Sequence, residues 1–206
     1  MLGAVVTTSS MAVGGRCAWA EAGVGAALTQ HRTDPRLGPK MLERLRGGAA
    51  PDAILRDLEQ SERGVGWRQL ALIDAQGCAA FFNGGKIYSV HEGQVGRDCV
   101  AAGNILRNTG VADAMVARFE ADADQPLAER LMRAIEAGDA AGGELAALKS
   151  AGLLVVHRES FAFVDLRVDL SQRPLAELRS LWELYRPTAE EYVVRALDPD
   201  SAPRPL

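Results

Sequence analysis

The chain has little cysteine and no long apolar run, and each shortage excludes a class of protein. Its three cysteines, Cys17, Cys78 and Cys99, are an odd number at irregular spacing. This argues against a disulfide framework and for free thiols in a reducing compartment. No apolar run approaches the roughly 18 residues of a membrane-spanning helix. Since the N-terminus also lacks the pattern of a signal peptide, we expect a cytoplasmic protein with no membrane partner.

The chain also has no large excess of positive or negative charge. The net charge is only −4 and the basic residues do not cluster, so we expect no nucleic-acid partner. A chain of 206 residues with 48% hydrophobic and 24% charged residues suits one well-buried globular domain. We predict a single domain over residues 1–197 and a flexible, proline-rich C-terminal tail over 198–206.

Motifs for metals and cofactors are missing. His31, His91 and His157 lie far apart, and neither H-x-x-x-H nor C-x-x-C spacing occurs, so no metal is expected. His31 follows "TQ" and could face a pocket, but we favour a solvated loop residue. "AGVGAA" lacks the third glycine of a dinucleotide fingerprint because Leu28 replaces it, and we expect no cofactor. "LKSAG" lacks the first glycine of a nucleophile elbow because Leu148 stands there.

The predicted strands are apolar nearly throughout, which is typical of strands covered on both faces. They span residues 3–6, 23–29, 68–74, 78–82, 99–104, 152–156 and 161–168.

The predicted helices carry apolar residues at the 3.6-residue period and come in pairs between the strands. They span residues 39–47, 51–60, 110–121, 126–138, 173–186 and 187–197. Pro126 marks a helix start, Gly138 a helix end, and Thr188 with Glu191 a capping box. Pairs of strands alternating with pairs of helices indicate an α+β protein in which two stacked sheets lie between helical layers, a four-layer αββα sandwich.

Several sequence blocks in register resemble one known family. They are "MAVGGRCAWAEAGVGAALTQ", "RQLALIDAQG", "AAGNIL", "GG" before "SAGLLVV", "DLRVD" and "PLAELRSL". The chain resembles domain of unknown function 1028, a family placed in the Ntn-hydrolase-like superfamily, from about Gly3 to the last helix. The resemblance implies the αββα sandwich of that superfamily. It also implies one further strand before the equivalent of Gly3, as relatives typically have.

The resemblance implies site positions residue by residue. Thr8 stands where the family usually has a serine. The chain departs from the family at "GGELAALKSA", where Glu144 replaces an aspartate and Lys149 a glutamine. The other matching positions are Thr29, Gln30, Arg68, Gln69, Gly103, Asn104, Arg167 and Asp169.

The run Thr7, Thr8, Ser9 and Ser10 invites comparison with the nucleophile of Ntn hydrolases, which is an N-terminal residue whose α-amine acts as base. Because Leu2 disfavours removal of the initiator methionine, we expect no mature terminus at Thr, Ser or Cys. The catalytic hypothesis is therefore an internal nucleophile at Thr8, facing a cleft while Thr7 and Ser9 point away.

In this hypothesis Asn104 or a backbone N–H stabilises an oxyanion, and Lys149 acts as base if burial lowers its pKa. In the alternative, the hydroxyls bond to the turn at residues 14–15. Asn104 is either a turn residue or an amide aimed into the cleft. Arg16 could lower the pKa of Cys17, although a buried, inert thiol is favoured.

Among the positions that match the family, we predict that four bind the substrate: Thr29, Gln30, Arg68 and Asp169. A guanidinium that opens an apolar strand must be paired or face a ligand, so Arg68 is a candidate. Arg167 and Asp169 share one strand face, and ion pairing is favoured there over carboxylate recognition.

Two functions from different classes fit these observations. The first is an amidohydrolase acting on a small linear amide or ureido compound, as the resemblance implies. The second is a non-catalytic ligand-binding or interaction module on the same fold. The expected partners are a small-molecule amide and further copies of the chain, in a dimer or larger homo-oligomer.

Overall fold

The computed structural model describes residues 1–203 and confirms a mixed α+β fold. Its strands are β1 (Leu2–Thr8), β2 (Ala18–Glu21), β3 (Gly25–His31), β4 (Arg68–Asp74), β5 (Ala79–Asn83), β6 (His91–Gly96), β7 (Cys99–Asn104), β8 (Ser150–Val156) and β9 (Ala162–Val168). Its helices are α1 (Gly14–Cys17), α2 (Leu37–Arg46), α3 (Pro51–Ser61), α4 (Val111–Ala121), α5 (Leu127–Ala140), α6 (Pro174–Tyr185) and α7 (Ala189–Leu197), with 3-10 turns at Val65–Trp67 and Arg186–Thr188.

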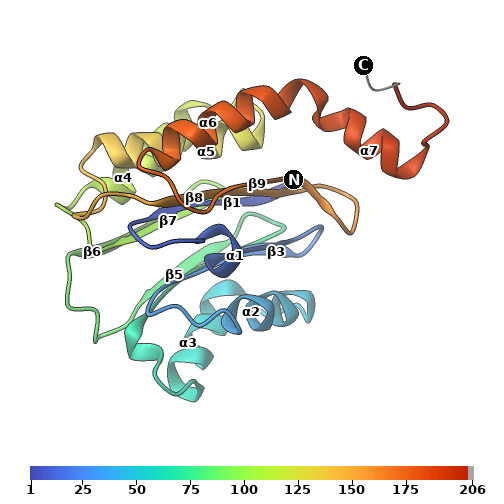
Figure 1. The fold of residues 1–206 in the computed structure, drawn as a ribbon. Helices are drawn as coiled ribbons and strands as arrows, with labels where there is room; N and C mark the ends of the chain where they lie inside the picture. The colour runs from blue at the N-terminus through green and yellow to red at the C-terminus, as the bar shows by residue number, and fades with distance from the viewer. Residues whose placement is uncertain (204–206) are drawn as a thin grey trace.

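Every pairing between these strands is antiparallel. One sheet has the order β1-β8-β9, a second has the order β2-β3-β4-β5, and β6 and β7 form a hairpin. Figure 1 shows α4, α5 and α6 on one side of the strands and α2 and α3 on the opposite side. The paired order of elements read from the sequence therefore corresponds to antiparallel sheets rather than to one parallel sheet with alternating helices.

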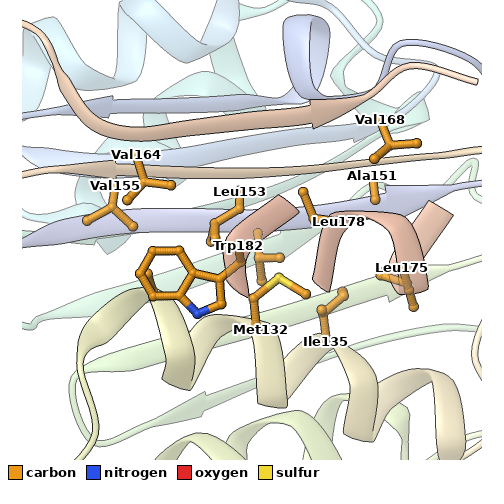
Figure 2. Close-up of a cluster of buried hydrophobic side chains, with 12 residues drawn as sticks. Met132, Ile135, Ala151, Leu153, Val155, Val164, Val168, Leu175, Leu178 and Trp182 are labelled. Atoms are coloured by element: carbon orange, nitrogen blue, oxygen red, sulfur yellow. The ribbon is translucent and has the colours of Figure 1, made fainter. Parts of the chain in front are cut away.

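The largest hydrophobic cluster lies between the β1-β8-β9 sheet and helices α5 and α6 (Figure 2). Leu153 and Val155 of β8 contribute to it from the sheet, and Met132, Leu178 and Trp182 contribute from the helices. A second cluster joins α2 and α3 to β3 and β4. Each sheet thus buries one face against its own pair of helices, as amphipathic helices require.

A buried ionic network lies beside the first cluster and ties α5 to α6. Glu129 accepts hydrogen bonds from Arg179 at 2.8 Å, from Arg133 at 2.7 Å and from the Trp182 indole at 2.8 Å. Burial opposes ionisation of Glu129, but these hydrogen bonds outweigh it and hold the pKa of Glu129 below its usual value. The carboxylate therefore remains charged in the interior because every partner stabilises the charge.

Three details of the helix predictions are corrected by the structure. Gly138 lies inside α5 rather than at its end. A glycine is needed at this position because α4 packs closely against it, and a Cβ there would lie 2.7 Å from the Met115 side chain. Pro126 precedes the first residue of α5. The capping box is wrong, since the Thr188 hydroxyl donates to Tyr185 O and caps no helix N–H.

The strands β2 and β6 and the short helix α1 were missed in the sequence. β6 reads "HEGQVG" and carries no apolar run because its residues are half-buried or exposed. Its partner β7, a half-buried strand, was predicted with its observed bounds. The predicted tail at 198–206 falls partly on residues 204–206, which lie outside the described residues. Within residues 1–203, no helix has the length and apolar character to cross a membrane.

Candidate functional site

A cleft of about 330 Å³ lies between the two main sheets and extends beneath α4 and α5. Its walls come from β1, β3, β7 and both helices. Small side chains such as Ala4 of β1 and Ala101 of β7 line its interior, where larger ones would fill it. The polar side chains of the cleft include the hydroxyl run at the end of β1. The cleft is therefore large enough for a small organic molecule with one polar end.

Strand alternation directs Thr8 into the space between the sheets. Ala4 and Val6, which share its face, belong to a cluster with Cys17, Ala18 and the half-buried Leu28 of the opposite sheet. Val5 points the other way, into the cluster under α5 and α6, and it also lines the cleft where the cleft extends beneath α5. Thr8 thus lines the cleft as predicted, half-buried at the strand end.

The structure corrects the prediction for Thr7 and Ser9, because both line the cleft as well, and Ser10 lines it too. The Thr7 hydroxyl donates to Ser150 O at 2.9 Å. The Ser9 hydroxyl donates to the Glu144 carboxylate, which also accepts the Ser9 backbone N–H at 2.9 Å. By contrast, the Thr8 hydroxyl donates to no group of residues 1–203 and accepts only a 3.4 Å contact from Ser10 N–H.

Ser150 fixes the loop that follows β1. This fully buried residue donates to Ser10 O at 2.7 Å and accepts the Val13 N–H at 3.1 Å. Together with the Glu144–Ser9 contact, it ties the loop to β8 and to the segment before β8. The loop residues therefore bond across the sheet rather than to the turn at residues 14–15.

Asn104 lines the cleft, but its amide is already engaged. Asn104 Nδ2 donates to Gln69 Oε1 at 2.9 Å, and Gln69, fully buried, donates to Gly103 O at 2.8 Å and to Asn83 Oδ1 at 2.8 Å. This network joins β4, β5 and β7. The left-handed backbone conformation that a turn residue would adopt occurs at the next residue, Ile105, which has a φ of 54°.

The cleft gathers only part of the residues predicted from the sequence. Gln30 lines it and donates to Ala102 O at 3.3 Å. Thr29 is fully buried outside it and donates to Asp34 O. Arg68 and Asp169 lie outside the cleft lining too, and within residues 1–203 Arg68 forms no salt bridge.

Lys149 does not meet the condition on which its role as base depended. Its side chain is exposed and lies outside the cleft, so the burial that the hypothesis requires is not present. Arg167 does form an ion pair, but with Asp165 at 2.7 Å rather than with Asp169, because β9 ends at Val168.

The two thiols that line the cleft are protonated at neutral pH. Burial raises the pKa of Cys17, against the smaller opposing effects of the Thr33 hydroxyl and the Arg16 charge. Burial and the charge of Glu120 raise the pKa of Cys99 to about 11. These environments are those of unreactive structural cysteines, which agrees with the interpretation of Cys17 as inert.

His31 belongs to the cleft, against the interpretation of it as a solvated loop residue. It ends β3 with a left-handed φ of 62°, lines the cleft, and is half-buried. Its Nδ1 lies 2.7 Å from Trp67 O, and the Tyr88 ring meets it edge-on at 5.5 Å between centroids. Glu144 was the other residue missed. Its only sequence signal was the departure from the family pattern.

This mixed α+β fold with a cleft between its sheets has relatives of known structure. The family model described as "Family of unknown function (DUF1028)" matches residues 1–178, and the chain belongs to this family. The chain is similar to the crystal structure of protein SPO2555 from Silicibacter pomeroyi, which carries the same family assignment. The two chains share 28% sequence identity with a TM-score of 0.84, covering 92% of this chain and 83% of that one. No curated protein matches significantly.

Proposed function

We propose that the protein is an amidohydrolase acting on a small linear amide or ureido compound in the cleft between the sheets. The proposal includes the finer fold assignment, a four-layer αββα sandwich of the Ntn-hydrolase kind. Supporting that assignment, helices cover the outer face of each sheet and the two sheets meet through Ala4, Val6 and Leu28.

The functional proposal rests on one observation, the hydrogen bonding of the Thr8 hydroxyl. Two members of the hydroxyl run line the cleft without donating their proton within residues 1–203, Thr8 and Ser10, and of these Thr8 is half-buried whereas Ser10 is exposed. The Thr7 and Ser9 hydroxyls are instead fixed in structural hydrogen bonds. A hydroxyl held at a strand end by rigid neighbours, with its proton free to be transferred, is arranged as an attacking group.

The contacts of Ser9, Ser150 and Asn104 suit supporting roles. Ser9 and Ser150 hold the loop after β1, so they position Thr8 without reacting. Asn104 has one amide hydrogen beyond the one given to Gln69, and this hydrogen is available to a substrate oxygen.

The test is release of ammonia or amine from a panel of small amides and ureido compounds. We expect wild-type protein to hydrolyse at least one compound, Thr8→Ala to abolish turnover, and Thr7→Ala to retain most of it. Circular dichroism checks that both variants fold. Turnover that survives in folded Thr8→Ala would contradict the assignment of Thr8 as nucleophile.

A ligand-binding module is the second candidate, and one observation favours it. Within residues 1–203, no basic side chain is hydrogen-bonded to Thr8, and Lys149 is exposed. In this case panel compounds would raise the melting temperature through binding to the folded state, with no product formed. Thermal shift and product assays on the same panel separate the two functions.

A further inference from the structure

We infer that His31 is the proton-transfer residue of the cleft, accepting the proton of the Thr8 hydroxyl during hydrolysis. This inference rests on the proposed function and deepens it. Nothing in the sequence pattern marks His31 as catalytic, because it follows an apolar strand and has no metal-type spacing to another histidine. The inference comes from three features of its surroundings.

The first feature is the backbone. Strict alternation along β3 would send the His31 ring to the helix-covered face, together with Ala27 and Thr29. The left-handed φ of 62° breaks that alternation at the last strand residue, and His31 lines the cleft instead. Such conformations in residues other than glycine persist only where the surroundings enforce them, and they concentrate at functional sites.

The second feature is the tautomer. A carbonyl oxygen can only accept a hydrogen bond, so the 2.7 Å contact between His31 Nδ1 and Trp67 O places the proton of the neutral ring on Nδ1. Nε2 then carries a lone pair. Within residues 1–203 no hydrogen bond engages Nε2, and His31 lines the cleft, so the lone pair is available to a group bound there.

The third feature is the clamp around the ring and the charge near it. Tyr88, which also lines the cleft, meets the ring edge-on, and the ladder pairs His31 with Arg68 of β4. Arg32 follows His31 and stacks on Trp67, with its guanidinium carbon 4.0 Å from the ring centroid, and Lys86 lies 5.8 Å from that centroid. The Tyr88 ring and the Trp67 carbonyl thus both contact the His31 ring and hold it in place.

The reaction balances with these groups alone. The Thr8 oxygen bonds to the amide carbon as the hydroxyl proton passes to His31 Nε2. The C–N bond then breaks, and Nε2 returns the proton to the departing nitrogen, which leaves as ammonia or amine. Water then attacks the resulting ester on Thr8, again through Nε2, which releases the acid and restores the Thr8 hydroxyl.

His91 supplies a matched control. Its Nδ1 also lies 2.7 Å from a backbone carbonyl, that of Ser89, but His91 is not among the residues lining the cleft. We expect His31→Gln to lower kcat at least 100-fold and to lose the acid-side limb of the pH profile. His91→Gln should stay within about twofold of wild type. Added imidazole should partly restore turnover to His31→Ala but not to Thr8→Ala.

The outcomes separate this inference from the proposed function. Nitrogen NMR of the imidazole rings, assigned with the two histidine variants, should show His31 as the Nδ1–H tautomer in the unliganded protein. The Nε2–H tautomer, or a normal rate and pH profile in folded His31→Gln, would overturn the role of His31 and leave the amidohydrolase standing. Absence of turnover in wild-type protein across the panel would overturn both.

Discussion

The two faces of the β1-β8-β9 sheet are packed in opposite ways. On the helix side, Leu153, Val155, Leu178 and Trp182 are nearly or fully buried and fill the space between sheet and helices. On the side facing the second sheet, residues as small as Ala4 line an open cleft. Strand β1 therefore contributes to the packed cluster on one face and lines the cleft on the other.

This difference indicates that the cleft side tolerates looser packing than the helix side. The helix side satisfies its buried charge Glu129 with three donors, whereas the cleft side holds residues in left-handed backbone conformations at His31, Asp98 and Ile105. Strain of this kind costs about 1–3 kcal/mol per residue and must be offset by well-packed regions elsewhere.

The largest effect on stability is expected from the filled face. Leu178→Ala should lower the free energy of unfolding by roughly 2–5 kcal/mol, because it leaves a cavity in a fully buried cluster. Urea unfolding followed by circular dichroism measures the change. The control is Leu184→Ala in the same helix, where the side chain is 77% exposed and the change should stay within about 0.5 kcal/mol.

Next in size is removal of the buried charge. Glu129→Gln should cost about 2 kcal/mol, since it removes the charged acceptor of three hydrogen bonds while Arg179 keeps its ion pair with Glu136. The folded pKa of Glu129 lies below the unfolded value of 4.5, so its contribution is complete above that pH and is lost as pH falls through the folded pKa. Unfolding measured between pH 7 and pH 3 should show a smaller loss of stability on acidification in Glu129→Gln than in wild type. An unchanged pH dependence would contradict this role.

A pair of matched alanines compares the two faces directly. Ala151 is fully buried in the helix-side cluster, and Ala4 on the adjacent strand lines the cleft. Ala151→Val should destabilise the protein by about 1–3 kcal/mol through overpacking, whereas Ala4→Val should cost less than 1 kcal/mol because its methyl groups enter open space. Equal costs in denaturant unfolding would mean that the cleft is no looser than the core.

The smallest expected effect distinguishes the first two hydroxyls. Thr7→Ala should cost about 1 kcal/mol, because it removes the hydrogen bond to Ser150 O. Thr8→Ala should cost less than about 0.5 kcal/mol, because the Thr8 hydroxyl makes only a long contact with Ser10 N–H. Thermal unfolding of both variants side by side measures the difference, and the reverse order would assign Thr8 to a structural role.

Local patterns were enough to predict much of the fold. The bounds of β4 and β7 were predicted from their sequences, and α3 and α4 were predicted to within one residue at each end. These elements carry apolar periodicity and clear start signals, such as Pro51 at the beginning of α3. β6 was missed because its side chains remain half-buried or exposed, and such a strand has no apolar pattern to reveal it.

The residues predicted for the candidate site also divide into those that line the cleft and those that do not. Thr8, Gln30 and Asn104, which were selected by their match to the family, line the cleft, and for Asn104 the sequence had left a turn residue as the alternative. Arg68, Asp169 and Lys149 do not line the cleft, since their positions depend on where each strand begins or ends and on what covers it.

The sequence by itself determined most of the elements and their paired order, because these depend on periodicity within a few residues. It indicated Thr8 only through the match of that position to the family serine. Only the tertiary structure decided that Glu144 binds Ser9, 135 residues away, and that Ser150 holds the loop after β1. It also turned His31 toward the cleft through one left-handed backbone angle. These contacts join segments that are distant along the chain, and their geometry is set by how two sheets meet, which no local pattern encodes.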